Sequence, residues 1–301
     1  MTQPQPAQYV TPASRPPNFV IVHGGVAGTL KESQASLDRA LPESLTAASA
    51  LDAVELAVAA LEDDPLLNAG YGSVLDREGR LEMDAGIADG STGRAAGVAN
   101  VTVRHPITLA RRVLEQTPHV FIAGRGAMEL GAGMEILEDS TPAQRARWDK
   151  ARAEGVLAAH HFGDPEYVDT VGSVALDAQG RLAAGSSTGG VFGKMTGRVG
   201  DAPIFGAGIY ASEAVAVVGT GVGELFLLTL ASLRAGRLVE EGAAPQAACE
   251  QTIEFLGSRQ KVSAGLLALD RESRWGAAYR GASWQVSGPH GPLDPVCIGG
   301  V

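Results

Sequence analysis

Glycine is the residue that most constrains the fold of this chain, because 39 of its 301 residues are glycine. That is nearly twice the usual share of about 7%. The glycines follow no G-X-Y period, which excludes a collagen triple helix. Since glycine contributes backbone freedom at an entropic cost, its abundance indicates many tight turns and close backbone approaches. Apolar residues make up 45% and charged residues 19%, which predicts a globular protein.

Segments typical of strands and helices alternate along the chain without a repeat of fixed period. A buried strand is expected at Phe19–His23 and a helix over 43–62. Residues 138–167 are the least patterned, and we expect a helix there followed by an exposed linker. Further strands are expected at 73–75, 81–85, 95–103, 170–176, 182–186, 214–218, 266–269 and 275–279, and further helices at 106–116, 125–137, 222–240 and 245–256.

Composition excludes several classes of protein. The net charge of −10 and the pI of about 5.1 argue against a nucleic-acid or anionic-membrane surface. No apolar stretch reaches about 18 residues, so no membrane span is expected. The two cysteines, Cys249 and Cys297, exclude a disulfide scaffold and are expected to be plain thiols. Residues 1–18 contain five prolines and no apolar core, which predicts a flexible tail rather than a secretion signal, and the cytoplasm is the expected location.

The second half of the chain carries four polar, glycine-rich clusters within about fifty residues. They are Asp169–Val174, Ser187–Gly190, Gly197–Ile204 and Gly219–Glu224. Each cluster alone has an ordinary interpretation, such as turn hydroxyls or a surface ion pair. Their order and spacing together are specific.

Taken together, the clusters resemble the plant-type L-asparaginase/isoaspartyl peptidase family of N-terminal nucleophile hydrolases. The most specific run is SSTGGVFGKMTGRVGDAPIFGAGIYAS at 186–212, and the resemblance extends from Val20 to about Gly281. Matching motifs in the first half are the HGG turn at 23–25, NAGYGSV at 68–74, MDA at 83–85, DG at 89–90 and HPITLARRVLEQTPHV at 105–120.

The chemistry of such a site can be followed from one residue. A threonine hydroxyl is a poor nucleophile until a base removes its proton. If the Asp169–Thr170 bond is cut, Thr170 gains an α-amine, whose reference pKa of about 7.7–8.0 suits a general base. In the precursor, the same hydroxyl can attack the Asp169 carbonyl and form an ester that water hydrolyses.

The resemblance implies a fold, a processing step and site residues. It implies an α+β fold, a four-layer αββα sandwich with two mostly antiparallel sheets between helical layers. It implies one domain over 19–301 that cleaves itself into 1–169, ending in the linker at 138–169, and 170–301, chains of 169 and 132 residues. It implies these roles: Thr170 as nucleophile and base, Thr188 as the hydroxyl that orients it, Thr220 and Gly221 as the oxyanion hole, Arg198 and Asp201 as ligands of a substrate's α-carboxylate and α-ammonium, and Gly223 and Asn68 as supporting residues.

The resemblance also implies partners. The substrates would be L-asparagine and β-aspartyl (isoaspartyl) dipeptides, hydrolysed without a cofactor by a homodimer of cleaved units. A structural sodium ion would bind backbone carbonyls of Leu61, Glu62, Asp64, Leu67, Ala69 and Tyr71.

The chain departs from the family's usual pattern in places. The first glycine turn reads HGGVAGT instead of HGGAGT, Arg125 replaces an acidic residue, and AAYRG at 277–281 replaces an FNT run. The first turn is one residue longer and must differ locally, Arg125 is expected at the surface, and the missing FNT run affects the expected substrate range rather than the nucleophile. The sequence STGG, where glycosylasparaginases carry STNG, favours asparagine and isoaspartyl peptides over glycosylated asparagine.

Other interpretations compete with this one. Gly185–Gly189 fits the G-x-S-x-G nucleophile elbow, with Ser187 followed by Asp270 and His290, but two glycines oppose the helix that an elbow needs. Gly219, Gly221 and Gly223 fail the dinucleotide fingerprint because Glu224 stands where its third glycine would fall. His23 is expected to be a packed strand-end residue rather than a metal ligand. A scaffold that binds amino acids without hydrolysis is the non-enzymatic alternative.

Overall fold

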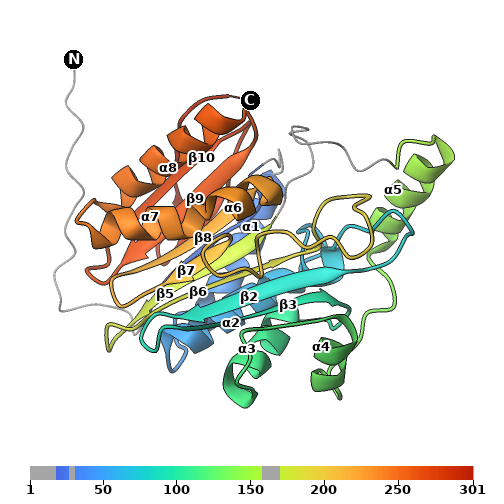
Figure 1. Cartoon of the computed structure of the whole chain (residues 1–301), viewed down its shortest axis with the longest axis horizontal. Helices are drawn as coiled ribbons and strands as arrows, with labels where there is room; N and C mark the ends of the chain where they lie inside the picture. Colours follow the sequence, from blue (N-terminus) through green and yellow to red (C-terminus); the bar gives the residue numbers. More distant parts are fainter. Residues whose placement is uncertain (1–17, 27–30, 158–169, 301) are drawn as a thin grey trace.

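The chain folds into two β-sheets that lie face to face, with helices against the outer face of each (Figure 1). This computed structural model describes residues 18–26, 31–157 and 170–300. The expected tail at 1–18 therefore lies outside the described residues except for Asn18, and so do 158–169 of the expected linker. The layers confirm the predicted αββα arrangement.

The larger sheet has the strand order β12-β11-β1-β5-β6-β2-β3-β4, and the smaller has β13-β10-β9-β8-β7. Neighbouring strands are antiparallel except for the pairs β3–β4 and β10–β13, which are parallel. The strands are β1 Asn18–His23, β2 Met83–Asp89, β3 Arg94–Val101, β4 Phe121–Ala123, β5 Val171–Asp177, β6 Leu182–Thr188, β7 Ile209–Ala211, β8 Val215–Gly221, β9 Ala264–Asp270, β10 Trp275–Arg280, β11 Val286–Gly288, β12 Gly291–Leu293 and β13 Val296–Cys297.

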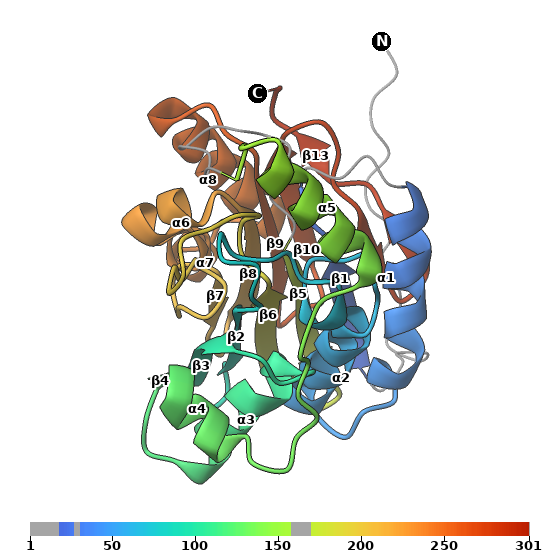
Figure 2. The same ribbon diagram turned by 90° about the vertical axis from the view of Figure 1, so that its right-hand side faces the viewer.

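Eight α-helices belong to the described residues. Helices α1 to α3 cover the larger sheet, and α7 and α8 cover the smaller one, as two perpendicular views show (Figures 1 and 2). Helix α5 lies at the right-hand side of the molecule in Figure 1 and therefore faces the viewer in Figure 2. The helices are α1 Lys31–Ser44, α2 Ala50–Glu62, α3 Pro106–Gln116, α4 Gly124–Leu130, α5 Pro142–Ala153, α6 Gly223–Thr229, α7 Ala231–Glu240 and α8 Pro245–Arg259.

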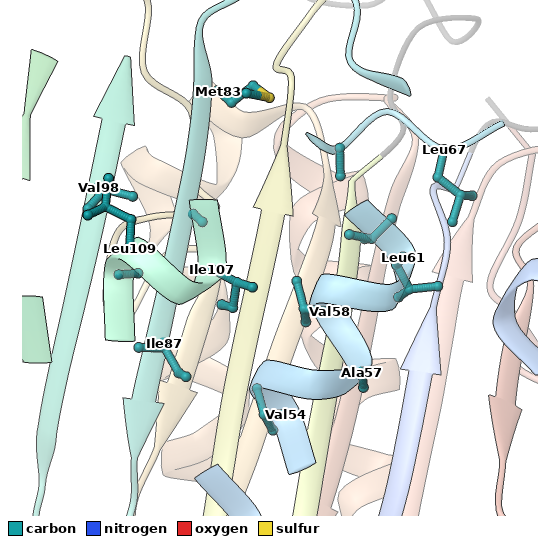
Figure 3. Packing of buried hydrophobic residues seen from close by; sticks show 14 of the residues in the cluster. Val54, Ala57, Val58, Leu61, Leu67, Met83, Ile87, Val98, Ile107 and Leu109 are labelled. Atoms are coloured by element: carbon teal, nitrogen blue, oxygen red, sulfur yellow. The ribbon is translucent and has the colours of Figure 1, made fainter. Parts of the chain in front are cut away.

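Three apolar cores correspond to the three spaces between the four layers. Figure 3 shows the first, where Val54 and Val58 of α2 and Ile107 of α3 lie against the larger sheet beside Ile87 of β2. The second core joins α7 and α8 to the smaller sheet. The third lies between the sheets, where Ile21 and Val174 belong to the same cluster as Val218 and Leu267.

Local signals explain where the principal helices begin. Ser49 is the N-cap of α2, because its hydroxyl accepts a hydrogen bond from the Asp52 N–H at 3.1 Å. Pro106 occupies the first turn of α3, where its missing N–H costs nothing. Apolar residues at helical spacing then direct one face of each helix onto the sheet.

Several predicted elements differ from the observed ones. The helix expected over 43–62 is the shorter α2, and the predictions did not include α1, which is polar and contains Pro42. No strand forms at 73–75, where a 3₁₀ turn at Gly70–Gly72 leads into irregular chain. The helix expected over 125–137 ends at Leu130. The helix expected over 222–240 divides at Leu230, whose φ of 49° interrupts helical geometry. The sequence also did not predict the short strands β4, β7, β11, β12 and β13.

Antiparallel pairing brings the start of β5, the end of β6 and the start of β2 to one end of the larger sheet. Val171 pairs with Ser187, and Thr188 pairs with Asp84. The turn before β8 lies at the opposite end, since a β-carbon on Gly90 would contact the Ser212 backbone. Strand β8 therefore ends, at Gly221, near the start of β5. We call this end of the sheets the Thr170 end.

Candidate active site

Thr170 and Thr188 form the centre of the site. Thr170 directly precedes β5 and Thr188 closes β6, so the pairing of these strands holds them side by side. The Thr170 hydroxyl donates a hydrogen bond to the Thr188 hydroxyl at 3.3 Å, and both side chains are buried. The structure thus brings the predicted nucleophile and its orienting hydroxyl together. Asp169, the residue before the predicted cut, lies outside the described residues.

The turn after Thr188 is fixed by backbone bonds. The Gly190 N–H donates to the Thr188 hydroxyl oxygen at 3.0 Å. The Asn68 side-chain amide donates to the Gly190 carbonyl at 2.7 Å, and its amide oxygen accepts the Val74 N–H at 2.9 Å. Because both ends of the Asn68 amide bind backbone groups, Asn68 shapes the wall of the site in this structure.

Arg198, Asp201 and Gly223 form a second group at the same end. A β-carbon on Gly223 would lie 2.8 Å from both the Arg198 Nη2 and the Asp201 Oδ1, so only glycine fits there. Burial raises the pKa of Asp201 to about 7, although the Arg198 charge opposes that shift. Asp201 Oδ2 is buried and has no hydrogen-bond partner among the residues that the structure describes.

Charge links this group to the threonine pair. Buried Asp84, whose backbone pairs with Thr188, exerts its charge on both Arg198 and Asp201. Arg198 also donates from Nε and Nη2 to the two carboxylate oxygens of Glu224, each at 2.9 Å. Lys194 is buried in the same region, and the charges of Asp84, Glu82 and Asp76 act on it.

Thr220 and Gly221 end strand β8, two residues before Gly223. The Thr220 hydroxyl is fully buried and has no hydrogen-bond partner within the described ranges. A buried donor without a partner is costly, and such groups are typical of sites that bind a ligand atom. This observation is consistent with the predicted oxyanion hole.

The loop from Leu61 to Tyr71 gathers backbone carbonyls beneath Gly72. A β-carbon on Gly72 would collide with the Leu67 carbonyl oxygen, and it would lie 2.9 Å and 3.0 Å from those of Asp64 and Pro65. Oxygen atoms converging in this way suit a hard cation. Among the described residues, no group of three or more His, Cys, Asp or Glu side chains could hold a metal.

The serine-elbow alternative does not fit the structure. Ser187 lies inside strand β6, fully buried, and an irregular segment follows that strand instead of the helix that an elbow requires. Asp270 binds its own turn through the N–H groups of Glu272 and Arg274. His23 is buried at the end of β1, where its ring lies 5.4 Å from that of Trp284, as expected for a packed residue.

The sequence patterns assigned no individual role to three charged residues of the site, Asp84, Lys194 and Glu224. Asp84 and Lys194 are buried, and Glu224 binds Arg198. Asp84 and Lys194 lie inside the quoted MDA motif and the quoted run at 186–212, so the resemblance contained them without indicating their burial. In the sequence, Glu224 is notable only as the residue that breaks a dinucleotide motif.

No helix of the described ranges has both the length and the apolar character that crossing a membrane requires.

Comparison with known proteins gives consistent matches over most of the chain. The family model described as Asparaginase matches residues 17–287. The isoaspartyl peptidase of Salmonella typhimurium is 42% identical over 279 residues, covering 84% of this chain and 89% of that protein. The plant-type L-asparaginase of Pyrobaculum calidifontis is 39% identical over 277 residues, covering 86% and 93%. The isoaspartyl peptidase/L-asparaginase of Homo sapiens is 38% identical over 287 residues, covering 88% and 91%.

Proposed function

The chain belongs to the asparaginase family, and on this premise we propose that it is an autoprocessing amidohydrolase that acts on L-asparagine and isoaspartyl dipeptides. The observation that carries the proposal is the arrangement at one end of the sheets. A pair of threonine hydroxyls lies there beside an arginine and an aspartate that suit the two charges of an amino acid.

Thr170 would perform both the processing step and the turnover. Its hydroxyl attacks the Asp169 carbonyl, the peptide nitrogen becomes the Thr170 α-amine, and water hydrolyses the resulting ester. The freed amine then takes the hydroxyl proton when a substrate carbonyl binds. The hydrogen bond to Thr188 supports this role, because it fixes the direction of the attacking oxygen.

The substrate would be held by its zwitterionic end. The guanidinium of Arg198 suits an α-carboxylate, and the unpaired Asp201 oxygen suits an α-ammonium group. Glu224 occupies the edge of the guanidinium formed by Nε and Nη2, which leaves the edge with Nη1 for the substrate. The side-chain carbonyl would then reach Thr170.

Thr220 and Gly221 would stabilise the negative charge that develops on the carbonyl oxygen during attack. The Thr220 hydroxyl is buried and unpaired, so it is free to donate to that oxygen. Removing one such donor typically lowers kcat by about 10²–10³-fold. Ammonia or the amine leaves as the acyl-threonine ester forms, and water then hydrolyses that ester to release the aspartyl product and free the Thr170 hydroxyl.

Denaturing electrophoresis and two assays test the proposal. Purified protein should give two bands of 169 and 132 residues, and Thr170→Ala should give one band without activity. Cleaved protein should release ammonia from asparagine and free leucine from β-aspartyl-leucine. An unbroken chain with full activity in intact-mass spectrometry contradicts the mechanism, and Thr170→Ala with normal turnover does so independently.

We propose further that a sodium ion stabilises the Leu61–Tyr71 loop. The carbonyls of Asp64 and Leu67, which converge beneath Gly72, support this site, and Asn68 connects the same loop to Gly190. The ion would hold the loop by binding its carbonyl oxygens and would take no part in the reaction. Replacing NaCl with N-methylglucamine chloride at equal ionic strength should lower Tm, and an unchanged Tm contradicts the site.

We also propose that two cleaved units form a dimer. Leu228 of α6 is 80% exposed, and Phe205 and Leu230 nearby are 37% and 43% exposed, which supports a partner surface there. Sedimentation velocity should show a dimer that Leu228→Glu weakens. A monomer at all concentrations contradicts this proposal without affecting the catalytic one.

A further inference from the structure

Two opposite charges, Lys194 and Asp84, are buried at the Thr170 end without a role in the proposed reaction. Lys194 is 1% exposed and Asp84 is fully buried. Burial lowers the pKa of Lys194 and raises that of Asp84, and in each case the charge of the other residue is the largest influence opposing the shift. Burying two charged side chains is expensive, so their retention beside a reactive site calls for a reason.

Lys194 supports the turn that binds the Thr188 hydroxyl. Its ammonium group donates to the Glu82 carbonyl at 2.6 Å. A β-carbon on Gly190 would lie 2.8 Å from both Cδ and Nζ of Lys194, so the lysine side chain lies directly beneath the Gly190 backbone. That backbone donates its N–H to Thr188. The position of Lys194 therefore determines the position of Gly190, and through it the acceptor that orients Thr170.

Asp84 supports the segment that would bind the substrate. Its carboxylate accepts the Asn100 N–H at 3.0 Å and is further stabilised by the N–H of Gly200. Gly200 lies between Arg198 and Asp201, and both of these side chains sense the Asp84 charge. The backbone of Asp84 also pairs with Thr188. Asp84 thus connects strand β2 to the carboxylate- and ammonium-binding residues.

We infer that Lys194 and Asp84 are positioning residues, which together set the distance between the nucleophile and the bound substrate. This inference rests on the function proposed above. Lys194 packs beneath the Gly190 turn, Asp84 supports the turn at Gly200, and the backbone pair of Asp84 with Thr188 joins the two turns. Within the part of the chain that the structure describes, neither side chain forms a hydrogen bond with Thr170, Thr188 or Thr220.

A misplaced substrate has a recognisable kinetic signature. Arg198 and Asp201 still hold the zwitterion when the pair is lost, so KM changes little. The carbonyl no longer lies at the correct distance from Thr170, and a displacement of about 1 Å can lower the rate about 10²-fold. A loss that is confined to kcat therefore separates positioning from substrate binding.

The decisive variant is K194M/D84N, which removes both charges and retains similar side-chain volume. Each single variant should lower Tm, because it leaves one buried charge without its partner. The double variant should have a higher Tm than either single variant, since the uncompensated charge is gone. Its kcat for β-aspartyl-leucine should nevertheless be about 10²-fold below that of the wild type, with KM within about threefold.

A matched control lies at the far end of the same sheet. Asp177 is buried and its carboxylate binds Arg181 at 2.6 Å, in the turn between β5 and β6. The double variant D177N/R181M also removes one buried carboxylate and one cation. It should lower Tm but leave kcat unchanged, because that turn lies away from the site.

Several results would overturn the inference. They are a K194M/D84N variant with wild-type kcat, a loss confined to KM, or a double variant less stable than both single variants. If the double variant does not fold, the K194R variant tests the inference instead, because arginine keeps the positive charge but is too large to fit beneath Gly190. A kcat about tenfold lower than that of the wild type supports the inference, and an unchanged kcat overturns it. An inactive wild type overturns the proposed function as well, whereas an active wild type matched by the double variant overturns this inference alone.

Discussion

The two ends of the facing sheets hold buried aspartates in different ways. At the end far from Thr170, Asp177 and Asp270 each close a hairpin turn. The Asp177 carboxylate accepts the N–H groups of Gln179 and Arg181 and the Arg181 guanidinium. Asp270 accepts the same set of groups from Glu272 and Arg274. Both turns follow one local pattern, an aspartate with an arginine four residues later.

At the Thr170 end, by contrast, buried polar groups are left without partners inside the described chain. Asp201 Oδ2 and the Thr220 hydroxyl are the clearest examples. Burial would raise the pKa of Asp177 too, but the N–H groups of Arg181 and Ala50 outweigh it and hold that pKa below its usual value. For Asp201 burial dominates, and the pKa rises to about 7. The far end has satisfied its two carboxylates. The Thr170 end also has one satisfied carboxylate, Asp76, which binds the N–H groups of its own turn, but it keeps the unpaired Asp201 oxygen and Thr220 hydroxyl for a ligand.

In the comparison of the two ends, the largest expected effect comes from removing the unpaired Thr220 hydroxyl at the Thr170 end. Thr220→Val keeps the shape of the side chain but removes the donor, so kcat should fall about 10²–10³-fold. Tm should stay equal or rise, because a buried hydroxyl without a partner is lost. Steady-state assays measure kcat, and calorimetry measures Tm. Thr252→Val, at another buried hydroxyl without a recorded partner, is the control that should leave kcat unchanged.

Asp201→Asn should weaken substrate binding and stabilise the protein. Because the substrate ammonium binds the ionised carboxylate, wild-type KM should rise as pH falls below about 7, and the variant should have a high KM at every pH. A raised folded-state pKa means that stability falls as pH increases from about 4 to about 7. The variant should therefore be more stable than the wild type at pH 8, by about 1–4 kcal/mol.

Urea unfolding at pH 8 and pH 4 measures this gain, which should disappear at the lower pH. Asp177→Asn provides the contrast, because its charge is stabilised by hydrogen bonds. A stabilising effect of both substitutions at pH 8 would remove the difference between the two ends.

Asp177→Asn should lower the free energy of unfolding by about 1–3 kcal/mol, because backbone donors lose a charged acceptor. The loss includes the contact with the Ala50 N–H at the start of α2, at 3.1 Å. Since the turn lies far from Thr170, autocleavage and kcat should be unchanged. Chemical denaturation and the two-band gel give the two measurements, and a fall in kcat would mean that the far end contributes to the reaction.

Sequence patterns predicted the framework of the site because its signals are local. Apolar runs bounded by glycine predicted the strands that end at Thr188 and Gly221, and the four clusters contain the threonines, Arg198 and Asp201, but not Asn68, Asp84 or Lys194. Helix α1 was not predicted because it is polar, and α6 and α7 were predicted as one helix because nothing local indicates the positive φ of Leu230.

The buried charges illustrate what local signals omit. A lysine after a glycine and an aspartate after a methionine are usually surface residues, and their burial depends on strands distant in sequence. Lys194 and Asp84 lie 110 positions apart and become neighbours only after β2 pairs with β6. The ion pair of Arg198 and Glu224 likewise depends on the fold, because it joins an irregular segment to the start of a helix. Pairing across elements sets the electrostatics of the site.

The smallest expected effect compares the two far-end turns with each other. Their sequences differ at the residue with positive φ, which is Gly180 with φ 77° in one turn and Ser273 with φ 63° in the other. A left-handed conformation costs a non-glycine residue about 1–2 kcal/mol, partly offset by the entropy that glycine loses. Ser273→Gly should therefore remove a backbone cost of about 0.5 kcal/mol, against which the loss of the interaction that Ser273 makes is set. Gly180→Ser should destabilise the protein by a similar amount, because a β-carbon there meets no neighbour and only the backbone conformation matters. Paired calorimetric scans of the two variants measure the difference, and shifts of the same sign would show that side-chain contacts, not backbone geometry, distinguish the turns.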